Sequence, residues 1–200
     1  MEEPLILLVD LEATCWEDKV DGLDRRQTVD DMEIIEFGCV LAKMNGDIVD
    51  AKSYMVRPQI HPKLTDFCTR LTTITQTDVE AAPYYLEVVT QIDYWLAPYK
   101  IKAWGSWGQY DKNQIEAERR RHNRSPSFNY FPHLNLKKLW RNGNGTGRRG
   151  GLKGALGFHG LEFEGTQHRG IDDALNISKL LPHIDVETAL NEVSKTRENT

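Results

Sequence analysis

Hydrophobic and polar positions divide the chain into alternating strands and helices, beginning with three strands. The apolar run of residues 5–9 predicts a buried strand. Residues 33–58 predict two more strands joined at Asn45-Gly46, because this dipeptide tolerates the positive φ angles of a tight hairpin turn. A fourth strand is predicted over residues 100–107. Strands joined by a hairpin pair with each other, so the first three strands are expected to share one sheet.

The remaining segments show helical spacing interrupted by glycine. In residues 83–99, Leu86, Val89, Ile92 and Leu96 recur at the spacing of one helix face. The other predictions are short helical turns over 61–83, helices over 109–123, 151–163 and 169–184, and a flexible Gly-rich loop over 141–151. A mixed sheet flanked by helices is an α/β domain. We expect this domain to span residues 1–184, followed by a charged tail, 185–200, that is either helical or frayed.

The composition is that of an ordinary globular protein. Hydrophobic residues make up 40% and charged residues 28% of the chain, and no stretch approaches the roughly eighteen apolar residues that a membrane span needs. The first ten residues lack the cleavage pattern of a secretory signal, so they predict a strand and a cytoplasmic protein without a membrane partner. Cys15, Cys39 and Cys68 share no metal-ligand spacing, which predicts reduced, buried thiols.

Basic residues are concentrated in one segment of an acidic chain. Residues 119–161 contain ten of the 25 Lys and Arg residues and none of the 30 Asp and Glu residues. A segment of one sign favours a polyanionic partner near that surface. The alternative is a solvated basic face that balances an acidic half. The ten residues are Arg119, Arg120, Arg121, Arg124, Lys137, Lys138, Arg141, Arg148, Arg149 and Lys153.

Two acids, Asp10 and Glu12, follow the first apolar strand. Side chains alternate between the two faces of a strand, so both carboxylates point the same way and Leu11 points the opposite way. Like charges this close repel each other, and desolvation adds to the penalty, unless a cation lies between them. The pair therefore predicts a cation at the end of the strand.

Two adjacent acids near the start of the last predicted helix face different ways. Positions at helical intervals after Asp173 are apolar, whereas those after Asp172 are polar. Periodicity thus places Asp173 on the inward face and Asp172 on the solvent face. An inward carboxylate needs a partner, but Asp173 could also serve as a helix cap.

Two further candidates, Asp111 and His168, are weak when each is taken alone. Asp111 follows the fourth strand and begins a helix, where Asp is among the commonest capping residues. His168 lies five residues before Asp173. Its imidazole could take a proton from water at neutral pH, although a loop histidine is more commonly a surface residue.

In combination and order, these residues resemble the three motifs of the DEDDh exonucleases, the DnaQ-like group within the ribonuclease H-like fold. The first motif matches "DLE" (Asp10 and Glu12), the second matches the Asp of "WGQYD" (Asp111), and the third matches His168 and Asp173. Residues 5–184 are also similar to the Eri-type branch, which contains the three-prime histone mRNA exonuclease. The similar segments are "DLEATCW", "EIIEFG", "VRP" followed by "LTTITQ", "GSWGQYDKN" and "HRGIDDALNI".

The resemblance implies a two-metal centre. Asp10, Glu12, Asp111 and Asp173 would hold two divalent cations, Mg²⁺ or Mn²⁺, which prefer hard oxygen ligands. Asp10 would bridge both ions, Glu12 and Asp173 would complete one, and Asp111 would support the other. His168 would deprotonate the attacking water.

The resemblance also implies how an RNA end is held. The backbone around Glu12, Ala13 and Thr14, together with His168, would bind the terminal nucleotide. From the basic segment we expect Arg148 and Arg149 to hold the strand beyond it, with Trp140 or Phe158 as a stacking surface.

The expected activity is metal-dependent 3′-to-5′ removal of nucleoside 5′-monophosphates from single-stranded RNA or RNA overhangs. One alternative is a DNA exonuclease of the proofreading or repair type, since RNA and DNA are told apart by contacts to the 2′-hydroxyl. The other alternative is a nucleic-acid-binding module of the same fold without the chemistry.

Overall fold

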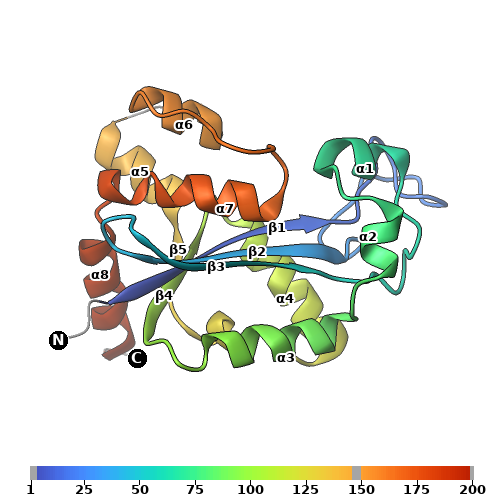
Figure 1. Ribbon diagram of the computed structural model, residues 1–200, viewed down its shortest axis with the longest axis horizontal. Helices are drawn as coiled ribbons and strands as arrows, with labels where there is room; N and C mark the ends of the chain where they lie inside the picture. Colours follow the sequence, from blue (N-terminus) through green and yellow to red (C-terminus); the bar gives the residue numbers. More distant parts are fainter. Residues whose placement is uncertain (1–3, 146–149, 199–200) are drawn as a thin grey trace.

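Five strands form one mixed sheet in the part of the chain that the computed structural model describes, residues 4–145 and 150–198, with side chains as far as Glu192 (Figure 1). Their order across the sheet is β3-β2-β1-β4-β5. The bounds are Leu5–Ala13 (β1), Ile34–Lys43 (β2), Ile48–Met55 (β3), Ile101–Ser106 (β4) and His133–Asn135 (β5). The chain has the ribonuclease H-like fold, as predicted.

The strand pairing agrees with a hairpin followed by parallel crossovers. β1 pairs antiparallel with β2 and parallel with β4, and β2 pairs antiparallel with β3. Gly46 in the turn between β2 and β3 has a φ of 92°, which confirms the predicted hairpin. In the β1–β2 register, Asp10 lies opposite Gly38 and Glu12 lies opposite Glu36.

Helices cover both faces of the sheet. Figure 1 shows α5, α6 and α7 on one face, α3 and α4 on the other, α1 and α2 beyond the end of β1, and α8 near its start. The α-helices are Asp66–Thr72 (α1), Gln76–Glu80 (α2), Tyr85–Leu96 (α3), Tyr110–His122 (α4), Leu136–Asn144 (α5), Leu152–Phe158 (α6), Gly170–Ser178 (α7) and Val186–Glu198 (α8). Two short 3₁₀ helices are Ser127–Tyr130 (η1) and Leu181–His183 (η2).

The strands β1, β2 and β4 are largely buried on both faces, which explains their continuous apolar runs, whereas the edge strand β3 has no buried residue. Ile6 and Leu8 of β1 pack with α5, α6 and α7, whereas Leu7 and Val9 pack with α3 and α4. Asp10 and Glu12 share the face of Ile6 and Leu8. The two acids therefore point toward the layer that contains α7.

Some predicted elements differ in the structure. Leu86 is 43% exposed, because α3 buries Tyr85 and Val88 instead. The last amphipathic helix ends at Ser178, and Pro182 lies in the separate turn η2. Neither β5 nor α5 was predicted, and α5 occupies the first residues of the expected Gly-rich loop.

Residues beyond the last predicted helix also pack on the domain. Val186 and Ala189 of α8 join the hydrophobic cluster beneath α7. None of the described helices combines the length and the apolar character needed to cross a bilayer. All three cysteines are free and buried, as predicted.

Candidate active site

The five predicted site residues line one cleft of about 540 Å³ at the end of β1. β1 contributes Asp10 and Glu12, and α4 contributes Asp111 from its first turn. His168 precedes α7, and Asp173 lies in the first turn of α7. Figure 1 shows α7 beginning above the end of β1, so acids that are distant in sequence meet there.

Three carboxylates form the tightest part of the cleft. Oxygen atoms of Asp10, Glu12 and Asp173 lie within 4.8 Å of one another. Burial, and then repulsion from neighbouring acids, raises the pKa of Glu12 to about 9 and holds the pKa of Asp10 well above its ordinary range. Burial also raises the pKa of Asp173 to about 6. The cluster therefore strongly disfavours full ionisation without a cation.

Asp111 lies in the same cleft but outside this group of three. Its Oδ1 accepts a hydrogen bond from the backbone N–H of Leu11 at 3.1 Å, which ties the start of α4 to β1. Burial raises the pKa of Asp111 to about 6, although the Leu11 N–H and the Ser106 hydroxyl favour its ionised form.

Ser106 and His133 lie near Asp111 and contribute to its surroundings. The Ser106 hydroxyl donates to the carbonyl oxygen of Gly108 at 3.1 Å, its oxygen lies 2.9 Å from Nε2 of His133, and its proximity opposes the rise in the pKa of Asp111. Burial lowers the pKa of His133 to about 4, so the ring is neutral at pH 7 and can donate one N–H. Sequence reasoning missed both residues, since neither belongs to a pattern that marks a site.

The loop before α7 holds His168 in an unusual conformation. His168 has a φ of 63°, which is uncommon for a residue with a side chain, and its backbone N–H donates to Oδ2 of Asp173 at 2.7 Å. The imidazole is exposed at the cleft. The backbone of His168 therefore holds the Asp173 carboxylate in place next to the His168 imidazole.

The two adjacent acids of α7 are separated as the periodicity predicts. Asp173 is buried in the cleft with 8% of its surface exposed. Asp172 lies outside the cleft, where its Oδ2 accepts the N–H of Thr166 at 2.8 Å. Asp172 thus stabilises the preceding loop.

The predicted nucleotide-binding residues are only partly brought together. Glu12, Ala13 and His168 line the cleft, but Thr14 is not among its lining residues. The Thr14 hydroxyl instead accepts the backbone N–H of Glu33 at 2.9 Å. Four aromatic side chains in the cleft wall went unpredicted: Trp16, Phe67, Trp107 and Tyr110.

Of the two aromatic residues expected to stack on a nucleotide base, only Phe158 is exposed. Trp140 is only 2% exposed and packs in the hydrophobic core, because its ring lies under Gly150 and beside Trp107. Phe158 is 57% exposed. Arg148 and Arg149 lie outside the described residues.

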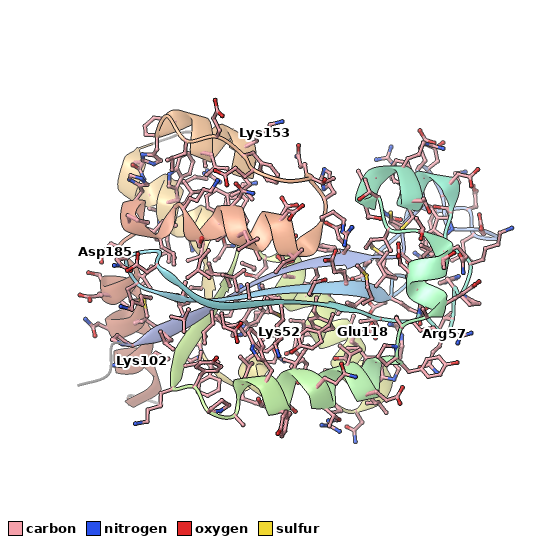
Figure 2. All side chains as sticks on the ribbon, in the orientation of Figure 1. Lys52, Arg57, Lys102, Glu118, Lys153 and Asp185 are labelled. Carbon is pink, nitrogen blue, oxygen red and sulfur yellow. The ribbon has the colours of Figure 1, made fainter. Side chains whose placement is uncertain are left out.

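In its described residues, the basic segment does not form one continuous cationic surface. The arginines of α4, and Arg124 just beyond it, are neutralised by four acids, in the pairs Arg119–Glu116, Arg120–Asp30, Arg121–Glu118 and Arg124–Asp93. Figure 2 shows Glu118 on the α3–α4 side of the sheet, opposite the α7 layer. Lys153 lies on the outer side of α6 in that layer (Figure 2). The part of the basic segment in and just after α4 therefore agrees with the alternative interpretation, a solvated basic face that balances acidic residues.

The residues present suit a divalent metal. The cleft offers carboxylate oxygens, the hard donors that Mg²⁺ and Mn²⁺ prefer. Five acids line the cleft, and one of them, Glu17, is paired with Arg70 at 3.6 Å. Among the described residues, no ion pair joins a Lys or Arg side chain to the other four, which are Asp10, Glu12, Asp111 and Asp173. Asp10, Glu12 and Asp173 would hold one ion, and Asp111 lies where it could support a second.

We expect the metal-free protein to lose stability between pH 5 and pH 9. Glu12, Asp111 and Asp173 have folded-state pKa values above those of an unfolded chain, so the folded form binds more protons. Their stabilising contribution is complete at low pH and is lost as pH rises through about 6 and about 9. Differential scanning calorimetry in EDTA should show a falling Tm.

Mn²⁺ should restore the Tm most strongly at the alkaline end, where the carboxylates are ionised. Glu12→Gln, which removes one charge, should flatten the pH dependence in EDTA. A metal-free Tm that rises across this range would contradict the prediction.

The site and the fold agree with a known class of proteins. The sequence model of the exonuclease family RNase_T matches residues 7–181. The chain therefore belongs to this exonuclease family.

Individual relatives narrow the class. The chain is 30% identical over 216 positions to ERI1 exoribonuclease 2 of Xenopus laevis, covering 96% of this chain and 30% of that protein. It is 28% identical over 204 positions to the 3'-5' exonuclease eri1 of Schizosaccharomyces pombe, covering 88% of this chain and 66% of the relative. The chain thus spans less than two thirds of either relative.

A solved structure is similar over nearly the whole chain. The nuclease domain of 3'hExo, a DEDDh family member bound to rAMP, superposes with a TM-score of 0.77 at 26% identity, covering 96% of this chain and 93% of that domain. The predicted resemblance to DEDDh exonucleases is confirmed.

Proposed function

We propose that this domain is a metal-dependent 3′-to-5′ exoribonuclease that releases nucleoside 5′-monophosphates. The observation that carries the proposal is the group of three buried carboxylates, Asp10, Glu12 and Asp173, with Asp111 and His168 in the same cleft. A binding module would have no use for carboxylates that repel one another and the phosphate backbone. This favours hydrolysis over the non-catalytic alternative.

Each residue has one part in the reaction. Asp10, Glu12 and Asp173 would hold one cation, and Asp111 would support the other. When bound, two Mg²⁺ or Mn²⁺ ions would lower the pKa of water and stabilise the departing 3′ oxygen. The His168 imidazole takes the proton as the water oxygen bonds to phosphorus and the bond from phosphorus to the 3′ oxygen breaks.

RNA is the proposed substrate, because the Xenopus relative is named an exoribonuclease and the similar nuclease domain was solved with rAMP. We place the protein in the cytoplasm, since its three buried free thiols suit a reducing compartment.

End-labelled RNA and DNA strands of one sequence, incubated with Mg²⁺, Mn²⁺ or EDTA, test the function. The expected result is a ladder of RNA products shortened from the 3′ end with either metal and no products in EDTA. Preferential degradation of DNA would support the proofreading or repair alternative. Binding without cleavage in every metal would support the non-catalytic module.

A second set of variants tests how the strand is held. Arg148→Ala combined with Arg149→Ala should raise the KM for oligonucleotides and flatten the salt dependence of binding, because fewer counterions are released. Hydrolysis of a minimal thymidine 5′-monophosphate ester should stay near normal, because this substrate does not extend beyond the cleft.

The matched control removes two arginines that already have acidic partners. Arg119→Ala combined with Arg120→Ala changes the charge equally, but these residues pair with Glu116 and Asp30. The oligonucleotide KM should change little in this control. Equal loss of activity on both substrates in the Arg148/Arg149 variant would mean that the loop belongs to the catalytic site or the fold.

A further inference from the structure

Glu36 is a buried carboxylate beside the catalytic acids that the proposed mechanism does not use. It is the third residue of β2, is fully buried, and is paired in the sheet register with Glu12. Its two oxygens accept four hydrogen bonds: from Ser53 Oγ at 2.7 Å, Gly170 N at 2.9 Å, Arg169 Nε at 3.3 Å and Ile171 N at 3.4 Å. Three of the four donors belong to the start of α7.

These contacts replace a cap that α7 does not supply for itself. The N-cap residue of α7 is Arg169, and its side chain makes no capping hydrogen bond. The N–H groups of the first turn, which a local Ser, Asp or Asn would ordinarily bind, donate to Glu36 instead. An anion is also favoured at the positive end of a helix.

The start of α7 lies directly on β2, with no space between the two backbones. A Cβ atom added to Gly38 would lie 1.9 Å from the carbonyl carbon of Gly170. A Cβ atom on Gly170 would lie 2.8 Å from the carbonyl oxygen of Asp10. Glycine at both positions therefore allows α7 to approach the strands closely enough for Glu36 to reach its first turn.

The segment held by Glu36 is flanked by two site residues. His168 immediately precedes Arg169, and Asp173 is two residues beyond Ile171. The backbone of His168 is further bonded to Asp173, so the two residues move together. A shift of this turn would displace both from Asp10 and Glu12 on β1.

We propose that Glu36 is a positioning residue of the exonuclease centre. Its carboxylate binds the uncapped start of α7 and the Arg169 guanidinium, and thereby sets the distance from Asp173 and His168 to the acids of β1. This inference rests on the proposed function and adds to it a residue that touches neither metal nor substrate.

Glu36→Gln is the direct test. The glutamine amide has the same size as the glutamate carboxylate. Each carboxylate oxygen of Glu36 accepts one backbone N–H of α7. In either orientation of the amide, its NH₂ group therefore faces an N–H donor, and one of the two hydrogen bonds is lost. Mutating a residue that hydrogen-bonds to a metal ligand typically lowers metal affinity or activity by about 10–100-fold. We expect kcat for RNA to fall within this range and KM for RNA to change by less than about threefold, since the strand-binding surface is untouched.

Glu33→Gln is the matched control. Glu33 is also a buried glutamate near the start of β2, and it accepts three backbone N–H groups, from Gln59, Ile60 and His61. It holds a loop rather than α7. Both variants should lower Tm, but kcat per folded molecule should fall only in E36Q. Equal losses of kcat in the two variants, or a normal kcat in E36Q, would overturn the proposal.

Two additions keep the test decisive. If E36Q does not fold, Glu36→Asp, which keeps the charge but shortens the reach, must reduce kcat, and a normal kcat would overturn the proposal. Calorimetric Mn²⁺ titration gives a readout that does not need hydrolysis, with weaker binding expected in E36Q but not in E33Q. A wild-type protein that binds Mn²⁺ but degrades no RNA would contradict the proposed function and still leave Glu36 tested.

Discussion

Asp173→Asn is expected to abolish nearly all hydrolysis of RNA. Asp173 lies within the group of three carboxylates, and a neutral amide binds a hard divalent cation more weakly than a charged carboxylate does. Transition-state stabilisation by a bound metal is worth several kcal/mol, so the loss should reach at least about 10³-fold in kcat. The measurement is the initial rate of 5′-monophosphate release at saturating RNA.

Asp172→Asn is the matched control, one residue away on the same helix. The Asp172 carboxylate accepts the backbone N–H of Thr166 in the loop before α7. Asp172 lies outside the cleft. This variant should keep most of its activity and lose on the order of 1 kcal/mol of stability. Equal losses in the two variants would contradict the assignment of Asp173.

His168→Ala should reduce turnover by about 10²–10⁴-fold, the usual contribution of a general base. RNA affinity should change far less, since His168 is expected to contact the terminal nucleotide alone and the rest of the strand is held by other residues. Rapid-quench kinetics with end-labelled RNA, together with equilibrium binding in Ca²⁺, would separate the two effects.

His183→Ala serves as a control for the loss of an imidazole. His183 stacks on His159 near η2 and does not line the cleft. Its removal should leave turnover close to that of the wild type. Near-normal turnover of His168→Ala would instead show that His168 is an ordinary surface histidine.

The acids of β1 and α7 could be predicted because each lies on a periodic element. Strand alternation fixes the common direction of Asp10 and Glu12, and helical spacing separates Asp173 from Asp172. Asp111 was different, since an Asp at a helix start is commonly a cap. Only the resemblance to DEDDh exonucleases selected Asp111, and the structure adds its bond to Leu11.

The features that escaped prediction depend on partners far away in the chain. Glu36 is an acid inside an otherwise apolar strand, which signals a buried partner, but nothing in the sequence identifies a helix start 134 residues later. Arg120 of α4 and Arg124 just beyond it belong to a basic run along the sequence, yet Asp30 and Asp93 approach them only after folding. β5 is three residues long and shows no recognisable pattern.

The meeting of Asp10 with Asp173 has a consequence for synthesis on the ribosome. The cleft needs residues from near both limits of the domain, and such long-range contacts form late. A nascent chain that ends before Asp173 contains Asp10, Glu12 and Asp111 but lacks the third carboxylate of the cluster and the helix that Glu36 holds. If the proposed activity holds, the nascent chain is therefore expected to leave the surrounding messenger and ribosomal RNA uncleaved until nearly the whole domain has been translated.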